Sequence, residues 1–399
     1  MRTRVFATIF VVLILPYFGI NGAVKIQNGA ELTIYTYESL LADPGFDYAE
    51  AFATYANLDS GSINVVLLAD AGSIVTRAAV EKSDPVADIL IGIDNVLVSQ
   101  ARELNILTPY VANGINNLEP GLVDSLASDY LLTPYDYGVI SLWFLQDSLN
   151  GTIDPASFDL NVLMTDEFSS QLIVQNPALS SPGLGFLLSS IALYGDDSGV
   201  DGLIEGDWED YWRALSVHTR LTSSWGEAID LLYTDESRSM MVSYSTSPAY
   251  GACLFDDTTT TSILPSIDGN LYGWQQVEGI GLVRNADHTD LAKEFIDWFI
   301  SEELQSEIHL NNWVYPAHKD IEEPECYSAA IPHSSITPLN QQITSEQLSN
   351  NLENWLDTWE IVWAEGPENE DNLIQDIVPV SHLFFMGLLV LVPLRRRKH

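Results

Sequence analysis

The sequence predicts an α/β protein with a doubly wound sheet, because short apolar runs alternate along the chain with segments of helical periodicity. Its 399 residues exceed a typical single domain, so two domains or one two-lobed unit are expected. Hydrophobic residues make up 46% of the chain and aromatic residues 10%, which favours a sizeable core even at a formal net charge of -40.

The expected strands are short apolar runs, and the expected helices carry apolar residues three or four positions apart. We expect strands over Leu32–Tyr37, Ile63–Leu68, Ala87–Ile93, Val139–Phe144, Leu172–Gln175, Ser239–Tyr244 and Gly279–Val283. We expect helices over Tyr48–Ala56, Ser73–Lys82, Asp207–Val217, Trp225–Tyr233, Thr289–Ser301 and Ser345–Ala364. The last helix carries a stripe that predicts packing on the body of the protein: Leu348, Leu352, Trp355, Trp359 and Trp363.

Basic residues are rare and gather at the ends of the chain. Of the 16 Lys and Arg, six are Arg2, Arg4, Arg395, Arg396, Arg397 and Lys398. The acidic remainder repels nucleic acid and anionic lipid and attracts cations, which excludes polyanion binding by the body of the protein. An acidic surface is also typical of adaptation to high salt, and that explanation says nothing about a ligand.

Residues 1–23 have the features of an export signal. Arg2 and Arg4 precede an apolar run over residues 5–20, and the small residues Gly22 and Ala23 form a cleavage point. The mature chain is therefore expected outside the cytoplasm. No Cys lies near that point, which excludes a tether through an N-terminal lipid-modified Cys.

The C-terminal part predicts a membrane tether. An acidic linker at 367–376 leads into an apolar segment at 377–394, and a basic tail follows at 395–399. Such a segment is a short transmembrane helix with its basic tail in the cytoplasm, or a sorting signal that is cleaved and replaced by a lipid. The arrangement resembles the C-terminal sorting signals of archaeal surface proteins, and both alternatives stay open.

The remaining chemistry-bearing patterns are weak. Cys253 and Cys326 are the two cysteines, and an exported chain permits but does not require a disulfide between them. Neither lies at metal-ligand spacing from another Cys or a His, so no zinc or haem site is predicted. No Gly-x-Ser-x-Gly and no phosphate-binding loop occurs. No enzyme is predicted, and the alternative from that class is an exported acidic glycan hydrolase using two of the many carboxylates.

Aromatic and small polar residues gather where strands are expected to end. The clusters are Tyr35–Ser39, Ile93–Asn95, Pro134–Gly138, Ser180–Gly183, Ser224–Glu227, Tyr244–Tyr250 and Asn312–Pro316. The carboxyl ends of strands form the ligand crevice in open α/β sheets, so these clusters predict a binding site.

In this order, the clusters resemble the thiamine-binding proteins of bacterial and archaeal ABC transporters, which are type 2 periplasmic binding proteins. The resemblance runs from Leu32 to about Ala364. Its most specific piece is Ser-Tyr-Ser-Thr-Ser-Pro-Ala-Tyr at 243–250, with Trp225 upstream and Asn312–Pro316 downstream.

The resemblance implies two doubly wound lobes joined by a hinge, with the ligand in the cleft between them. Residues 24–137 and 252–366, the latter including the Trp-rich helix, would form one lobe, and 138–251 the other. Closure over the ligand would create the surface that a membrane permease and its ATPase subunit act on. A monomer without enzymatic activity or cofactor is the expectation.

The resemblance also implies which side chains hold thiamine. Aromatic faces suit both the flat aminopyrimidine and the cationic thiazolium ring. A carboxylate would balance the charge or accept a hydrogen bond from the exocyclic amine, and hydroxyls would hold the hydroxyethyl or phosphate end. The implied residues are Trp225, Tyr244, Tyr250 and Trp313 in an aromatic box, Tyr37 in its wall, Asp70 as the carboxylate, Ser180 and Ser181 as the hydroxyls, and Asp94 as a residue that shapes the cleft or caps a turn.

Two departures from the family pattern bear on specificity. Residues 42–45 stand where the family has an additional Trp, and Ala178 and Leu179 stand where it has an Arg. Free thiamine is therefore favoured over its phosphates, although backbone amides beside Gly183 remain available to a phosphate.

Other binding functions stay open at this stage. Related two-lobed receptors coordinate ferric ion through adjacent tyrosines, whereas Tyr244 and Tyr250 are separated in sequence and accompanied by tryptophans. A polyamine receptor would also use acidic and aromatic side chains. A structural surface protein would have the C-terminal tether but no saturable ligand.

Overall fold

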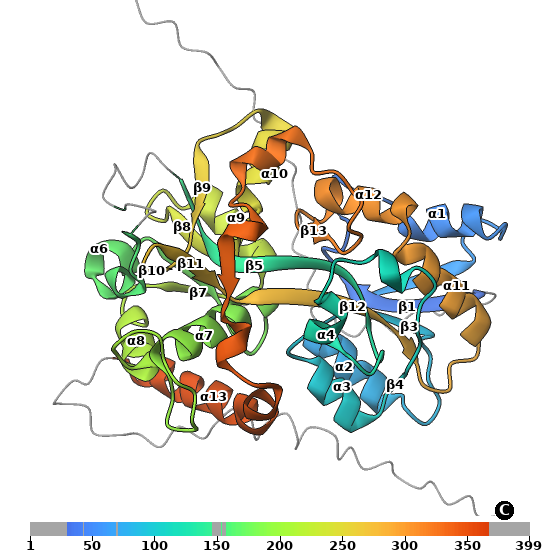
Figure 1. Cartoon of the computed structure of the whole chain (residues 1–399), viewed down its shortest axis with the longest axis horizontal. Helices are drawn as coiled ribbons and strands as arrows, with labels where there is room; N and C mark the ends of the chain where they lie inside the picture. Colours follow the sequence, from blue (N-terminus) through green and yellow to red (C-terminus); the bar gives the residue numbers. More distant parts are fainter. Residues whose placement is uncertain (1–29, 43, 69–70, 146–152, 154–156, 367–399) are drawn as a thin grey trace, which may run out of the picture.

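The computed structural model describes residues 30–42, 44–68, 71–145, 153 and 157–366, and it shows two lobes (Figure 1). This arrangement confirms the predicted α/β fold. The expected export signal, the C-terminal linker, apolar segment and tail, and Asp70 lie outside the described residues. Among the described helices, none has the length and apolar character needed to cross a membrane.

The first lobe is built on the sheet order β2-β1-β3-β12, in which β12 runs antiparallel to β3. Its strands are β1 (Leu32–Tyr37), β2 (Ile63–Leu68), β3 (Ile89–Asp94), β4 (Leu107–Thr108), β12 (Gln275–Val283) and β13 (Tyr315–Pro316). Its helices are α1 (Tyr48–Tyr55), α2 (Ala71–Val80), α3 (Val98–Leu104), α4 (Leu122–Leu126), α11 (Thr289–Phe299) and α12 (Glu302–Asn311). β1 and β3 are buried along most of their length, as parallel strands covered on both faces require.

The second lobe follows the sheet order β5-β8-β6-β7, with β9 also paired to β5. Its strands are β5 (Thr133–Leu145), β6 (Leu172–Gln175), β7 (Arg220–Thr222), β8 (Met240–Tyr244) and β9 (Thr260–Ile263). Its helices are α6 (Asp166–Ser169), α7 (Ser181–Tyr194), α8 (Trp208–Leu215), α9 (Trp225–Thr234) and α10 (Ser247–Phe255). A small separate sheet contains β10 (Ser266–Ile267), β11 (Asn270–Gly273) and β14 (Ile336–Pro338).

Two long strands connect the lobes. β5 and β12 lie side by side and run from one lobe into the other (Figure 1), with Glu278 opposite Asp136 in their antiparallel register. β5 begins at Thr133, earlier than the expected start at Val139, because its first residues pair with β12 and β13 in the first lobe. The crossing strands therefore form the floor between the lobes.

The last helix, α13 (Ser345–Glu365), corrects one predicted assignment. Residues 252–366 were expected in the first lobe, but α13 packs on α8 of the second. Trp355 and Trp359 are buried in the second hydrophobic core, and the Trp359 ring meets Trp212 edge-on with centroids 5.8 Å apart. The expected apolar stripe thus packs on the body, with Leu352 and Trp363 partly buried at its edge. Strand β9, from the same expected range, likewise belongs to the second lobe, and the remaining lobe boundaries stay predictions.

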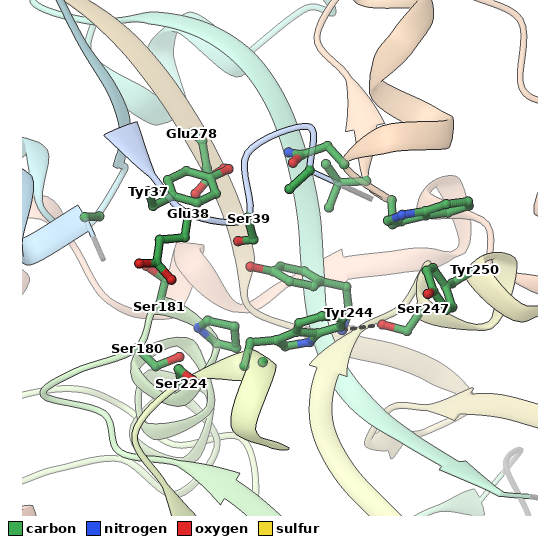
Figure 2. A pocket seen from close by; sticks show the side chains of 18 of the residues that line it. Tyr37, Glu38, Ser39, Ser180, Ser181, Ser224, Tyr244, Ser247, Tyr250 and Glu278 are labelled. Atoms are coloured by element: carbon green, nitrogen blue, oxygen red, sulfur yellow. Dashed lines mark hydrogen bonds between the residues drawn. The ribbon is translucent and has the colours of Figure 1, made fainter. Parts of the chain in front are cut away.

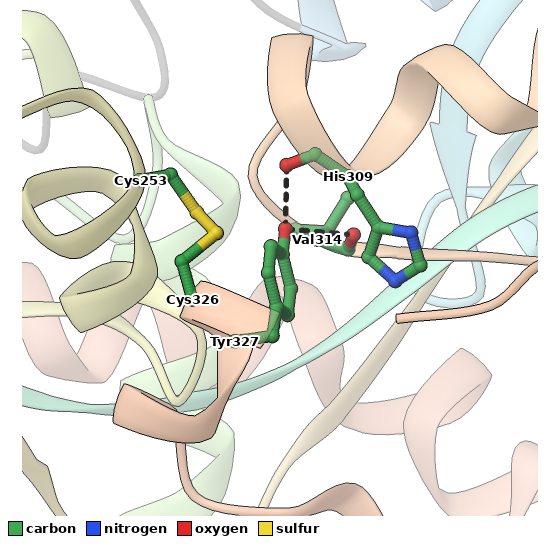
Figure 3. Close-up of a disulfide and its surroundings, with 5 residues drawn as sticks. All are labelled: Cys253, His309, Val314, Cys326 and Tyr327. Atoms are coloured by element: carbon green, nitrogen blue, oxygen red, sulfur yellow. Dashed lines mark hydrogen bonds between the residues drawn. A yellow bond between two sulfur atoms is a disulfide. The ribbon is translucent and has the colours of Figure 1, made fainter. Parts of the chain in front are cut away.

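A disulfide joins the two cysteines, a pairing that the sequence left undecided. Cys253 on α10 and Cys326 in the short helix after β13 have Cα atoms 5.2 Å apart (Figure 3). Beside it, the Tyr327 hydroxyl donates to the carbonyl oxygens of His309, at 2.6 Å, and Val314, at 3.3 Å. The bridge therefore fixes α10 to the short helix whose Tyr327 is hydrogen-bonded to Val314, the neighbour of Trp313.

Candidate ligand-binding site

A cavity of about 300 Å³ lies at the junction of the two lobes, at the lower end of the range of roughly 300–1,000 Å³ for small-molecule sites. Its lining comes from strand ends, helix starts and the segment after α12, as the sequence predicted for a cleft site (Figure 2). Seven of the nine predicted ligand residues line it: Tyr37, Ser180, Ser181, Trp225, Tyr244, Tyr250 and Trp313.

Trp225 begins α9, directly after the capping residue Ser224. Its indole nitrogen donates to the Ser243 hydroxyl at 2.8 Å, and the Ser243 and Ser247 hydroxyls share a hydrogen bond of 2.7 Å. The Ser247 hydroxyl in turn accepts from the Tyr244 amide at 3.1 Å (Figure 2). The serines of the 243–250 motif thus connect the Trp225 ring to the end of β8.

Tyr244 ends β8 and packs against the cores of both lobes. Its hydroxyl donates to Gln276 Oε1 at 3.1 Å, on crossing strand β12. Its ring lies on the backbone of β5 at Gly138, where a Cβ atom would come within 2.9 Å of Tyr244 Cδ1. A glycine is needed there because any side chain would displace the ring.

Tyr250 and Trp313 form an edge-to-face pair, with ring centroids 4.9 Å apart and planes at 79°. Trp313 has φ 60°, a left-handed backbone conformation that is unfavourable for a bulky residue. The Thr246 hydroxyl donates to the Trp313 carbonyl oxygen at 2.7 Å and helps to hold this conformation. Strained backbone that is fixed by several contacts is a feature of binding sites.

Tyr37 ends β1 and reaches the floor of the cavity. Its hydroxyl donates to Glu278 Oε2 at 2.8 Å and lies 3.1 Å from the Tyr135 hydroxyl. Gly92 has φ +102° and leaves room for the Tyr37 ring, since a Cβ there would lie 2.4 Å from Tyr37 Cδ1. Burial, with the charges of Glu278 and Asp136, raises the pKa of Tyr37 well above its usual value, so the hydroxyl keeps its proton.

Ser180 and Ser181 lie at the N-terminus of α7, at the cavity wall. The sequence clusters predict a turn here, but a proline in the first helical turn is favoured, and Pro182 is the second residue of this long buried helix. A cavity wall with free amide groups at a helix start is able to hold a polar or anionic end of a ligand.

Asp94 caps a turn, one of its two predicted roles, and is not among the residues that line the cavity. Its Oδ1 accepts from the amide nitrogens of Val96 and Leu97, both at 2.9 Å. Burial raises the pKa of Asp94, although these amides and the Ser181 hydroxyl act in the opposite direction. The ligand role of Asp70 falls outside the described residues and stays a prediction.

Sequence reasoning missed several lining residues, including Glu278, Trp143, Ser247 and Asn312. Glu278 had no usable signal, because one Glu cannot be told apart among 56 acidic residues. Ser247 and Asn312 lie inside the aromatic and polar clusters, but their aromatic neighbours give the stronger signal of a binding site. Trp143 lies inside an expected strand, where an aromatic residue is more typical of the core.

Comparison with known proteins shows which family this chain belongs to. The profile of bacterial extracellular solute-binding proteins matches residues 47–306. The chain belongs to this family. As a solute-binding protein of an ABC transporter, it captures a small molecule outside the cytoplasm and delivers it to the transporter.

The solute-binding protein is similar to receptors named for thiamine. The thiamine-binding periplasmic protein of Brucella melitensis is 28% identical over 336 residues, 84% of this chain and 92% of the relative. That of Escherichia coli is 29% identical over 289 residues, 71% of this chain and 80% of the relative. These relatives are binding proteins and not enzymes, and they confirm the resemblance inferred from the sequence clusters.

Solved structures confirm the type 2 periplasmic-binding-protein fold. A periplasmic thiamin binding protein superimposes with a TM-score of 0.69 at 25% identity, covering 83% of this chain and 96% of that one. Iron-bound HitA from Pseudomonas aeruginosa has a TM-score of 0.66 at 16% identity, covering 83% and 98%. At that lower identity the likeness concerns the fold alone.

Proposed function

We propose that the solute captured in this cavity is thiamine, and that free thiamine is preferred over its phosphates. The observation that carries the proposal is the convergence of Trp225, Tyr244, Tyr250 and Trp313 on one small cavity. A cation over an aromatic face is stabilised by roughly 0.5–2 kcal/mol, and thiazolium is a permanent cation. The relatives named for thiamine support the same ligand.

The charges of the lining favour a cation over an anion. Among the described residues that line the cavity, the charged ones are Glu38 and Glu278, and none is basic. Ala42 and Leu179 line the wall near the positions where the family carries a Trp and an Arg. A thiamine phosphate would bring negative charge toward this acidic wall with the α7 N-terminus as its compensation.

The tyrosines of the cavity are poorly arranged as ferric-ion ligands. The Tyr244 hydroxyl is engaged with Gln276, and the Tyr250 ring packs edge-on against Trp313. Within the described residues, no three His, Cys, Asp or Glu side chains are grouped so as to hold a metal ion. These aromatic side chains are therefore better arranged to pack against a flat ligand ring than to coordinate ferric ion.

The deciding measurement is a titration of intrinsic tryptophan fluorescence in the full chain with thiamine, thiamine monophosphate, spermidine and ferric citrate in parallel. Saturable quenching is expected with thiamine at the lowest concentration, and weaker quenching with the monophosphate. A folded protein that responds to spermidine or ferric citrate and not to thiamine would replace this proposal with one of the other receptor functions.

We also propose that the protein works as a monomer at the cell surface, tethered by the apolar segment 377–394. Support comes from the sequence pattern of that segment and its basic tail. Fractionation of cells that produce the chain with and without residues 377–399 tests the tether. Retention of both forms in the membrane fraction would contradict it.

A further inference from the structure

Glu278 occupies a position in the cavity that the aromatic box does not explain. It lies on crossing strand β12 and lines the floor of the cavity beside Tyr37 (Figure 2). Its Oε2 accepts from the hydroxyls of Tyr37 and Tyr135, both at 2.8 Å, and its Oε1 accepts from Gln276 Nε2 at 3.0 Å. This carboxylate is therefore held in one orientation before any ligand arrives.

A second carboxyl group lies directly beside it. Asp136 faces Glu278 across the β5–β12 ladder, so the two side chains project from the same face of the sheet as immediate neighbours. Asp136 is 1% exposed, and its Oδ2 accepts from Asn312 Nδ2 at 2.6 Å. Two carboxyl groups that lie side by side in a buried site do not both ionise readily, so one of them keeps its proton.

Among the described residues, no positive charge compensates the pair. No ion pair within the described part of the chain involves Glu278, Asp136 or the nearby Asp94. The groups that face the pair are Tyr37 on β1, Asp94 on β3, Tyr135 on β5, Tyr244 on β8, Gln276 on β12, Asn312 after α12, and Tyr327. All of them are neutral or acidic, so two ionised carboxylates here would repel each other at close range.

The protonation of the pair follows from this environment. Burial raises the pKa of Glu278 to about 7, with the Asp94 charge adding to the rise and the two tyrosine hydroxyls opposing it. Burial and the Glu278 charge together raise the pKa of Asp136 well above its usual value. Before a ligand binds, the pair therefore holds a proton near neutral pH.

We propose that Glu278 is the residue that selects a cation in this cavity, and that its pairing with Asp136 couples ligand capture to release of a proton. The inference rests on the proposed thiamine function and adds the charge-recognising group and its regulation. A cationic ring entering the cavity takes the place of the shared proton, which leaves to solvent. The buried net charge is the same before and after binding, which avoids the cost of two uncompensated carboxylates.

Glu278 and Asp136 would distinguish charged from neutral ligands at the two strands that connect the lobes. β12 carries Glu278 and β5 carries Asp136, and both strands cross between the lobes. A neutral molecule of the same shape would stack on the aromatic rings but could not displace the proton. Selection by charge would therefore come from the floor of the cleft, and stacking of the flat rings from its aromatic walls.

The test is isothermal titration calorimetry of the full chain with thiamine, at pH 5, 6, 7 and 8 and in two buffers of different ionisation enthalpy. We expect release of about one proton per thiamine below pH 7 and an affinity that rises about tenfold from pH 6 to pH 8. Glu278→Gln is expected to lower the affinity at pH 8 roughly ten- to hundredfold and to remove the proton release.

Three controls separate a specific effect of Glu278 from a general loss of charge or of folding. Glu294→Gln makes the same change on the exposed face of α11 and is expected to bind as the parent does. Glu38→Gln removes the other acidic side chain of the lining, and a larger loss there than in Glu278→Gln would overturn the proposal. Circular dichroism verifies that each variant is folded. Proton release by the unsubstituted chain tests the proposal independently of any variant.

The two proposals fail differently. Absence of thiamine binding by the unsubstituted chain at every pH would overturn the thiamine function. Thiamine binding with a flat pH profile and no proton release would leave that function standing and overturn the role of the Glu278–Asp136 pair.

Discussion

The indole nitrogen of Trp225 donates a hydrogen bond of 2.8 Å to the hydroxyl of Ser243, which fixes the first residue of α9 to the C-terminal end of β8. The ring is thereby oriented toward the cavity that it lines. Trp225 is expected to contribute to ligand binding by stacking on the ligand and by the orientation that its hydrogen bond to Ser243 gives the ring. Substitutions can separate these two contributions.

Trp225→Ala is expected to weaken thiamine binding roughly two- to thirtyfold, the equivalent of one cation–π contact. Trp225→Phe keeps an aromatic face but loses the hydrogen bond to Ser243, so an intermediate loss is expected. Equilibrium dialysis with labelled thiamine measures both. Trp363→Phe, on α13 and outside the cavity lining, is the control, and an equal loss there would contradict a specific role for Trp225.

Gly138→Ala is expected to reduce thiamine affinity while the protein remains folded. The new Cβ would lie 2.9 Å from Tyr244 Cδ1 and 3.3 Å from Val314 Cγ1, so the Tyr244 ring must move. At Gly226, in the same cavity lining, a Cβ would meet only the Ser224 hydroxyl, at 3.9 Å, so Gly226→Ala should weaken binding less. Calorimetry measures the thiamine affinities of the two variants. Equal affinities would contradict the idea that the Tyr244 ring depends on its close contact with Gly138.

Loss of the disulfide is expected to affect both stability and binding. Cys253 and Cys326 are 73 residues apart, and opening a loop of that length lowers the free energy of unfolding by about 4 kcal/mol in the chain-entropy account. Tyr250 lies on the same helix as Cys253, so thiamine affinity should fall as well. Urea denaturation of Cys253→Ser/Cys326→Ser, with and without thiamine, measures both effects. An unchanged midpoint of unfolding would contradict the effect on stability, and an unchanged shift of that midpoint on adding thiamine would contradict the effect on affinity.

In the ligand-free protein, ionisation of Glu278 is expected to lower stability as the pH rises through the range from about 4.5 to about 7. A carboxyl group whose pKa is raised in the folded state binds more protons there than in the unfolded chain, so the free energy of unfolding falls with pH in this window. For Glu278 the loss is on the order of 3 kcal/mol and is complete above pH 7. Urea midpoints of Glu278→Gln should show a smaller slope of this sign, since buried Asp136 keeps its own contribution.

His309 acts in the opposite direction and must be separated from Glu278. Burial lowers the pKa of His309 to about 4 from 6.5, so the unfolded chain binds the extra proton and stability falls as the pH drops through that range. His309→Gln is expected to remove this acid-side loss and leave the slope of Glu278 in place. Identical pH profiles for the parent and both variants would contradict the two assignments.

Local patterns gave most of the secondary structure. The strands Leu32–Tyr37, Ile63–Leu68 and Leu172–Gln175 were predicted with their observed bounds, because each is a short apolar run between clear turn residues. α7 and α10 are absent from the expected helices, because the Ser-Pro dipeptides at their first turns are also typical of loops. Proline is compatible with both interpretations, and only packing of the following residues distinguishes them.

Some residues of the candidate site could likewise be predicted from the sequence, and others could not. Aromatic residues such as Trp225 and Trp313 were found because they stand in unusual clusters, and the structure brings them to one cavity. The Glu278–Asp136 pair was not found, since its members are far apart in sequence and meet only through the strand register. Nor did the sequence reveal that α13 packs on the second lobe, because an apolar stripe shows which face is buried and not what covers it.

The placement of α13 also dictates an order of events during synthesis. The second core draws on residues from Ile140 to Val242 and again on Trp355 and Trp359, while the first core combines β1 with α11 and α12. Each lobe therefore needs segments made early and segments made late, so neither core is complete until the ribosome has nearly finished the chain. Such long-range closure is slow, and the unfinished chain leaves both apolar faces exposed for most of its translation.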